Sequence, residues 1–359
     1  MSKLAKALSG AAGNAGGTEG YVEDVFSTFL YTGNDTTQTV INGIDLAGEG
    51  GLVWVKVRSN PTTHGLVDTA RGVTKVLQSS ETAAEATVAQ AVNGFLSNGF
   101  QIANSNDTIF NRSPRTYVSW TFRKAPKFFD VVTFTGTGAA QNISHSLGSV
   151  PAMIFCKSIS NVENWYSYNK DLNGGTNPEQ YWVELDTTSA QQGPNSAFWN
   201  NTAPTDAQFT VGTAFPNGYT YVAYIFASDA GGYGDDGSES IIKCGSYTTD
   251  GAGKASVNLG WEPQFIITKS SSGTGGWYMF DTMRGLTGNF GTAASAQKLF
   301  ANATDAESAQ NLFSINATGF DDEGGILAGG DFVYMAIRRP MKTPTAGTEV
   351  FAVDSRNST

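Results

Sequence analysis

The stretch Tyr117-Val118-Ser119-Trp120-Thr121-Phe122-Arg123 is the first of three related stretches in this chain. The others are Tyr221-Val222-Ala223-Tyr224-Ile225-Phe226-Ala227 and Phe332-Val333-Tyr334-Met335-Ala336-Ile337-Arg338. In each copy one set of alternate side chains is apolar throughout, which is the period of a β-strand with one face on a core. Pro126 and Pro340 follow two of the copies and should end those strands. The recurrence predicts a structural unit that is repeated three times and ends each time with this strand.

Two further strands recur ahead of the closing one. The first ends at Tyr31-Thr32-Gly33 in one copy and at Phe134-Thr135-Gly136 and Tyr247-Thr248-Thr249 in the others. The second is apolar on consecutive positions and carries a lysine at the same place in every copy: Lys56, Lys157 and Lys269. Consecutive apolar residues indicate a strand that is covered on both faces, so we expect the lysine where the strand emerges into solvent.

The fold class expected from these patterns is all-β, with three tandem antiparallel β-sandwich repeats of the jelly-roll or lectin-like type and short helical excursions. Each repeat would hide its apolar side within itself. The chain would then divide into an N-terminal attachment arm (1–20), unit 1 (21–125), unit 2 (126–230), a flexible Gly/Asp linker (231–237), unit 3 (238–340) and a C-terminal tail (341–359). Short helices are predicted at 81–92 and, in the corresponding place, at 305–312. In the tail, Val350-Phe351-Ala352-Val353 could add a strand.

Composition and charge exclude several classes of function. The 359 residues carry a net charge of −10, with no cluster of Lys and Arg, so we expect no nucleic-acid partner. No run approaches the ~20 apolar residues of a membrane span, so no membrane insertion is expected. Cys156 and Cys244 are too few for a disulfide framework or a zinc site and are interpreted as small buried hydrophobes.

One polar motif recurs in two of the three copies. Asp68-Thr69-Ala70-Arg71-Gly72 corresponds to Asp281-Thr282-Met283-Arg284-Gly285, whereas the second copy has diverged there. One interpretation is an internal Asp68–Arg71 and Asp281–Arg284 pair that fixes a tight turn, with the glycine at positive φ. The other is a ligand site in which these polar groups and an aromatic platform, Trp165 or Trp277, read a sugar.

The remaining candidate groups are sparse. His64 and His145 occupy non-equivalent places and are interpreted as surface side chains, so no catalytic, cofactor or metal site is assigned. The acidic run Asp321-Asp322-Glu323 is expected in a glycine-bounded loop as solvated charge, with Ca²⁺ binding left open. Gly231 to Gly237 carries acidic residues and precedes no helix, so it is no phosphate loop.

Taken together, these motifs resemble the repeated domains of virion structural proteins from marine tailed phages, especially cyanophages. The resemblance is carried by Tyr31-Thr32-Gly33, by Asn98-Gly99-Phe100, by the block from Trp277 to Gly285 and by the closing strands. It covers about residues 22 to 350 and implies a tail, fibre or capsid-surface protein with lectin-like β-sandwich folds, assembled in the host cytoplasm and located in the virion.

The function expected from the resemblance is a non-catalytic component of the tail or fibre apparatus that presents loops to a host-surface glycan. An alternative is a capsid decoration or tail-assembly scaffold protein that binds only other virion proteins, through the N-terminal arm and sheet edges. A glycan-cleaving enzyme would require two carboxylates that face one cleft. A homo-oligomer is expected, with a trimer common among fibres of this kind.

Overall fold

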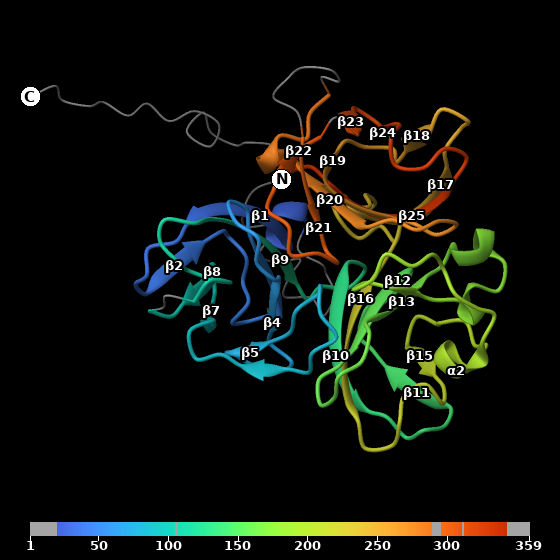
Figure 1. Ribbon diagram of the computed structural model, residues 1–359, viewed down its shortest axis with the longest axis horizontal. Coiled ribbons are helices and arrows are strands. Elements are labelled where there is room, and N and C mark those ends of the chain that lie inside the picture. The colour runs from blue at the N-terminus through green and yellow to red at the C-terminus, as the bar shows by residue number, and fades with distance from the viewer. Residues whose placement is uncertain (1–19, 105–106, 289–295, 311, 343–359) are drawn as a thin grey trace, which may run out of the picture.

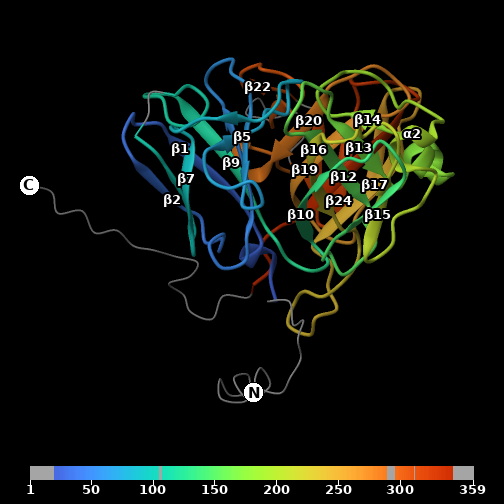
Figure 2. The same ribbon diagram turned by 90° about the horizontal axis from the view of Figure 1, so that it is seen from below.

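The chain folds into antiparallel β-sheets with only short helical turns, as the computed structural model in Figure 1 shows. The structure describes residues 20–104, 107–288, 296–310 and 312–342; the predicted arm and tail therefore lie almost wholly outside it. Three lobes, which correspond to units 1, 2 and 3, surround a common centre in Figure 1. The view at right angles in Figure 2 shows the sheets of units 2 and 3 one behind the other, with unit 1 beside them.

Unit 1 follows a 3-10 turn, η1 (Val22–Asp24), and consists of a larger and a smaller sheet with one two-stranded ribbon. The larger sheet has the order β1 (Phe26–Thr32), β9 (Thr116–Arg123), β3 (Gly51–Val57) and β4 (Gly65–Asp68). The smaller sheet has the order β2 (Gln38–Ile41), β8 (Gly99–Ile102) and β7 (Val92–Leu96), and the ribbon pairs β5 (Lys75–Val76) with β6 (Ala86–Thr87).

Unit 2 repeats this plan with more irregular chain between its strands. The larger sheet has the order β10 (Phe129–Thr135), β16 (Thr220–Phe226), β12 (Met153–Ser158), β13 (Tyr166–Asn169) and β14 (Val183–Glu184). The smaller sheet pairs β11 (Gln141–Ser144) with β15 (Gln208–Val211). The helical turns are η2 (Leu172–Gly175), η3 (Pro178–Gln180) and α2 (Ser196–Trp199).

Unit 3 has the larger sheet with the most strands, six. Its order is β17 (Ile242–Thr248), β25 (Asp331–Arg338), β19 (Pro263–Ser270), β20 (Trp277–Asp281), β21 (Gln297–Phe300) and β22 (Ser308–Ala309). The smaller sheet has the order β18 (Lys254–Asn258), β24 (Gly319–Glu323) and β23 (Phe313–Asn316), and η4 (Thr282–Arg284) follows β20.

The predicted closing strands β9, β16 and β25 occupy the same place in all three larger sheets. Each lies between the first strand of its unit and the lysine-bearing strand, and pairs antiparallel with both. Every strand pair among the described residues also falls within one predicted unit. A central strand is covered on both faces, which explains why the closing strands are buried along almost their whole length.

The two faces of the closing strand enter different cores in unit 1. Val118, Trp120 and Phe122 belong to a central cluster, whereas Tyr117 belongs to a cluster enclosed between the two sheets of unit 1. The central cluster contains residues from all three units, from Val22 to Ile337. The prediction that each unit hides its apolar side within itself is therefore wrong, because the inner faces of the three larger sheets share one core.

Equivalent closing-strand residues do lie in similar surroundings. Trp120, Tyr224 and Met335 are 0%, 1% and 0% exposed and all belong to the central cluster. Aromatic rings from different units touch there: Phe122 lies 5.7 Å from Phe226 and 6.4 Å from Phe265 between ring centroids. Burial of large rings contributes much of the stability of a core, so the common centre holds the three lobes together.

Two predictions about the connections are wrong. Among the residues described, 81–92 and 305–312 form no helix. They contain the short strands β6 and β22, which pair with β5 and β21. Strand pairing thus outweighed the helical spacing of the apolar residues on which the prediction rested. The 231–237 segment is no flexible linker either. Tyr233 is fully buried and its hydroxyl donates to the Pro126 carbonyl at 3.1 Å. This contact fixes the segment against the chain that connects β9 to β10.

Candidate functional site

The groups singled out by sequence gather where one unit meets the next, at three junctions that we call 1–2, 2–3 and 3–1. A pair of backbone hydrogen bonds recurs at each. At junction 1–2 the Glu85 N–H donates to Ile159 O (3.0 Å) and the Glu163 N–H to Thr82 O (3.0 Å). The corresponding pairs are Gln191 to Ser271 and Gly275 to Thr188 at junction 2–3, and Glu307 to Arg58 and Thr62 to Thr304 at junction 3–1. The three units therefore close into a ring through contacts of one kind.

The three equivalent lysines lie inside these junctions. Lys56, Lys157 and Lys269 are all 0% exposed, so the prediction that they emerge into solvent is wrong. Each ammonium group donates to a backbone carbonyl of the neighbouring unit: Thr304 (3.3 Å), Thr82 (2.9 Å) and Thr188 (3.4 Å), respectively. Burial lowers the pKa of each lysine to about 8, because the charged form loses its hydration. The lysines reach across the ends of the sheets instead of into water.

Lys269 provides a test of this arrangement, because burial is the single cause of its lowered pKa. A lysine whose pKa is lower in the folded protein than in the unfolded chain makes the protein more stable as pH rises towards the unfolded value. The free energy of unfolding of the wild type, relative to Lys269→Met, should therefore rise by on the order of 1 kcal/mol per pH unit between pH 8 and 10. Urea denaturation at several pH values measures this difference, and a difference that is constant with pH would contradict it.

Three ring nitrogens make a second equivalent set of contacts. Trp165 Nε1–H donates to Gln78 O at 3.0 Å, and Trp277 Nε1–H donates to Glu184 O at 2.8 Å. At junction 3–1 the place of the indole is taken by His64, whose Nε2 lies 2.9 Å from Phe300 O. All three rings are 0% exposed, so neither tryptophan offers a face to a ligand and His64 is not the predicted surface side chain.

The protonation state of His64 is fixed by its two partners. Trp54 Nε1–H donates to His64 Nδ1 at 2.8 Å, which makes Nδ1 the acceptor and leaves the proton on Nε2 for the Phe300 carbonyl. Complete burial and the nearby ammonium group of Lys56 lower the pKa of His64 well below its ordinary value. The imidazole is therefore neutral at physiological pH and serves as a junction contact.

The Asp-Thr-x-Arg-Gly motif forms the internal pair that the first interpretation predicted. Arg71 Nε and Arg284 Nε each lie 2.6 Å from the Oδ2 of Asp68 and Asp281, and the same aspartates accept the backbone N–H of the arginine three residues on. The glycines that follow have φ of 94° and 96°. These side chains are at most 1% exposed. The turn interpretation is confirmed for both copies.

The same aspartates also bind the next unit. Tyr224 OH donates to Asp68 Oδ2 at 2.8 Å, and Trp120 Nε1–H donates to Asp281 Oδ2 at 3.0 Å. In both cases the donor is the middle aromatic residue of a closing strand. The carboxylate of each motif thus joins a turn of one unit to the central strand of its neighbour.

Junction 2–3 lacks this connection. The positions of Asp281 and Arg284 are occupied in unit 2 by Asn169 and Leu172, and the closing-strand position is Met335, whose thioether is at best a weak acceptor. Accordingly, Asn169 Nδ2 is buried and has no hydrogen-bond partner among the described residues. Leu172 is fully buried in the place of the guanidinium. Unit 2 has exchanged a polar contact for an apolar one.

The acidic run lies in strand β24, not in the predicted loop. Successive side chains of a strand point to opposite faces, so Asp322 turns inward and accepts from Tyr247 OH (3.1 Å), while Asp321 accepts from Asn316 Nδ2 (3.0 Å). Within the described ranges no group of three metal-binding side chains converges. The cysteines Cys156 and Cys244 are buried thiols as predicted, and His145 is half-buried.

Comparison with known proteins identifies one family. A family model described as Domain of unknown function (DUF7483) matches residues 22–340. The chain belongs to this family. Its model spans all three units together, in agreement with the shared core and the closed ring. No curated protein matches the chain. In the part of the chain that the structure describes, no helix is long and apolar enough to cross a membrane.

Sequence reasoning found the Asp and Arg positions but missed the roles of His64 and the three lysines. The signal was present in the repeats: each lysine stands at one position of the aligned units, and His64 stands where the other copies have tryptophan. A polar residue that recurs at the end of an apolar strand can be a junction contact as well as a solvent-facing end.

Proposed function

We propose that this protein is a non-catalytic structural protein of a phage virion, part of the tail or fibre apparatus, built from three jelly-roll or lectin-like sandwiches. One observation carries the structural role. The residues that could have served a ligand site (Asp68, Arg71, Asp281, Arg284, Trp165 and Trp277) are engaged in contacts within and between units. Their chemistry holds the ring together.

The placement in a virion is supported by the resemblance of the Tyr-Thr-Gly strand end, the block from Trp277 to Gly285 and the closing strands to repeated domains of phage virion proteins. A ring whose units are joined by buried hydrogen bonds to Asp68 and Asp281 and by a common aromatic core suits a part that bears load in an assembled particle. Attachment through the N-terminal arm, recognition of a host-surface glycan and assembly into a homo-oligomer belong to the same proposal.

Immunogold electron microscopy of purified phage particles tests the placement. Antibody against the folded protein should label the tail or its fibres. Label confined to the head would instead support the capsid decoration alternative. Particles that carry no label, although the protein is abundant in the infected lysate, would contradict a virion role.

A further inference from the structure

Two polar side chains of unit 2 are buried at junction 2–3 without a partner. Ser167 and Asn169 lie two positions apart on β13, so both point to the same face of the sheet. Their exposed fractions are 0% and 1%, yet Ser167 Oγ and Asn169 Nδ2 make no hydrogen bond to any residue that the structure describes. Buried polar groups in native proteins are nearly always satisfied by protein atoms or by ordered water, so these two atoms mark a candidate binding site.

The orientation of the Asn169 amide is fixed by the backbone. The Asp171 N–H donates to Asn169 Oδ1 at 2.9 Å, which identifies the other atom as the Nδ2 donor. In Asp68 and Asp281 the corresponding atom is Oδ2, which accepts from an arginine and from the aromatic residue of the next closing strand. Unit 2 therefore presents a donor where the other units present an acceptor, and Asn169 needs an acceptor in return.

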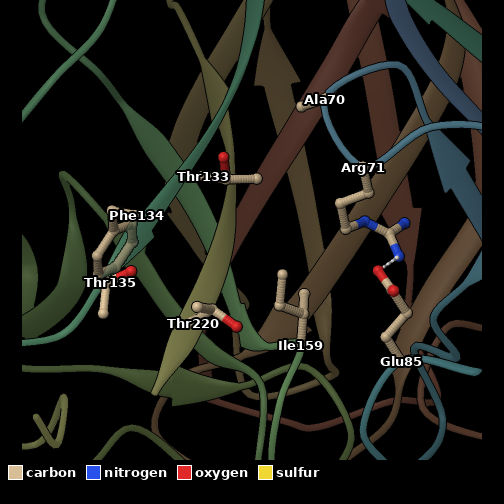
Figure 3. A pocket seen from close by; sticks show the side chains of 8 residues that line it. All are labelled: Ala70, Arg71, Glu85, Thr133, Phe134, Thr135, Ile159 and Thr220. Carbon is tan, nitrogen blue, oxygen red and sulfur yellow. Dashed lines mark hydrogen bonds and ion pairs between the residues drawn. The ribbon is translucent and has the colours of Figure 1, made fainter. Parts of the chain in front are cut away.

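The arginine of the other units also binds a carbonyl beside this position. Arg71 Nη2 donates to Leu66 O, and Arg284 Nη2 donates to Met279 O, both at 3.0 Å. Figure 3 shows the Arg71 guanidinium, which extends further to pair with Glu85 at 3.1 Å. One guanidinium thus bridges the aspartate and the carbonyl, because it is rich in N–H groups.

Unit 2 has smaller side chains at three positions around the same place. Leu172 replaces the arginine and has no group that could donate to the carbonyl of Ser167, which corresponds to the carbonyls bound by arginine in the other units. Ser167 itself replaces a leucine or a methionine, and Met335 replaces a tyrosine or a tryptophan on the closing strand. These exchanges remove side-chain volume and leave Asn169 Nδ2 and two oxygens of Ser167 around the position that the guanidinium bridges elsewhere.

This position lies between unit 2 and unit 3. Burial raises the pKa of the Cys244 thiol, and the charges of Lys170 and Asp171 act on the same thiol. Cys244 is the register partner of Met335, so the turn that follows Asn169 lies near the closing strand of unit 3. A group bound by Asn169 is therefore placed at the interface of the two units.

We propose that Ser167 and Asn169 bind one ordered water molecule at junction 2–3. Its oxygen accepts from Asn169 Nδ2, and its hydrogens donate to the carbonyl and hydroxyl oxygens of Ser167. Buried waters typically make about three hydrogen bonds, which these groups provide. A metal cation would face the amide N–H and an anion would face the carbonyl oxygen, so neither matches the site. The water takes the part of the guanidinium in the other two junctions, a role that goes beyond the proposed function because it does not depend on a virion.

Crystallography of the intact protein, at a resolution that shows ordered waters, tests the proposal. The wild type should show density for one water at about 2.7–3.2 Å from Asn169 Nδ2 and from an oxygen of Ser167. The variant Asn169→Asp/Leu172→Arg copies unit 3 and should lose this density, because its guanidinium can donate to the Ser167 carbonyl directly. An ion at this position, or a protein atom that accepts from Asn169 Nδ2 in the wild type, would overturn the proposal.

NMR of the wild type keeps the test decisive if the double variant folds poorly. The side-chain amide protons of Asn169 should show a nuclear Overhauser effect to water. Asn111 supplies the matched control: it is 0% exposed, but its Nδ2 donates to Asn34 Oδ1 and to Thr36 O, so its amide protons should show no such effect. An effect that is missing at Asn169, or equal at the two amides, would refute a bound water.

Discussion

Replacing Asp281 with alanine is expected to destabilise the protein by about 3 kcal/mol, because it removes the nearest partner of the buried Arg284 and leaves that guanidinium only the Glu307 carboxylate, 3.6 Å away. Arg284, whose side chain is 0% exposed, would lose its 2.6 Å partner, and Trp120 Nε1–H would lose its acceptor. The loss affects a turn of unit 3 and the closing strand of unit 1 together. The free energy of unfolding from chemical denaturation measures the effect.

The chain itself supplies the control. Unit 2 has Asn169 and Leu172 where unit 3 has Asp281 and Arg284, so the double variant Asp281→Asn/Arg284→Leu imports an arrangement that already folds within this ring. Replacing a buried ion pair with neutral residues is often close to neutral, so the double variant should lose less than half of what Asp281→Ala loses. Equal losses in the two variants would show that the ion pair is not the cause.

Acidification is expected to weaken junction 3–1 through His64. Its pKa is lower in the folded protein than the ordinary value of 6.5, so its contribution to stability is complete above pH 6.5 and is lost as the pH falls. The loss is about 1.4 kcal/mol per pH unit below 6.5 until the folded-state pKa is reached. A proton on Nδ1 would face the N–H of Trp54, which is itself a donor, and the charge would lie near Lys56 and Arg284.

Comparison with His64→Gln isolates this contribution from those of the carboxyl groups. The glutamine amide can accept from Trp54 and donate to Phe300 but does not titrate. Stability of the wild type relative to His64→Gln should fall between pH 6.5 and 5, as followed by thermal unfolding at fixed ionic strength. His145→Gln, at a half-buried position, should change the pH dependence much less. A constant difference between wild type and His64→Gln would refute a neutral buried imidazole.

Much of the fold could be predicted from the sequence because strand pairing is local to each unit. The alternating side chains of Val118, Trp120 and Phe122 correctly indicated a face on a core, and the repeats placed that strand at the end of each unit. Alternation cannot reveal whether the core belongs to one unit or to three, since the same apolar face serves either arrangement. The shared core depends on contacts between the inner faces of different units, which a local sequence pattern does not encode.

The candidate site was predictable in its chemistry but not in its location. Positive φ at Gly72 and Gly285 and the aspartate–arginine spacing follow from local geometry, so the turn interpretation succeeded. The hydrogen-bond partners of Trp165, Trp277 and Lys157 come from other units, and no local sequence pattern predicts them. The pairing of Arg58 with Glu307 at junction 3–1 is less predictable still, because the two residues belong to the first and the third unit.

The third unit meets the first without a peptide bond between them, so the ring is completed head to tail within one polypeptide. In an assembly of three identical subunits, any change to such an interface would be repeated threefold by symmetry. Here a single codon alters one contact alone: histidine replaces tryptophan once, and asparagine replaces aspartate once. Covalent continuity therefore allows one interface to carry a histidine and another an asparagine and a leucine while the remaining architecture stays intact.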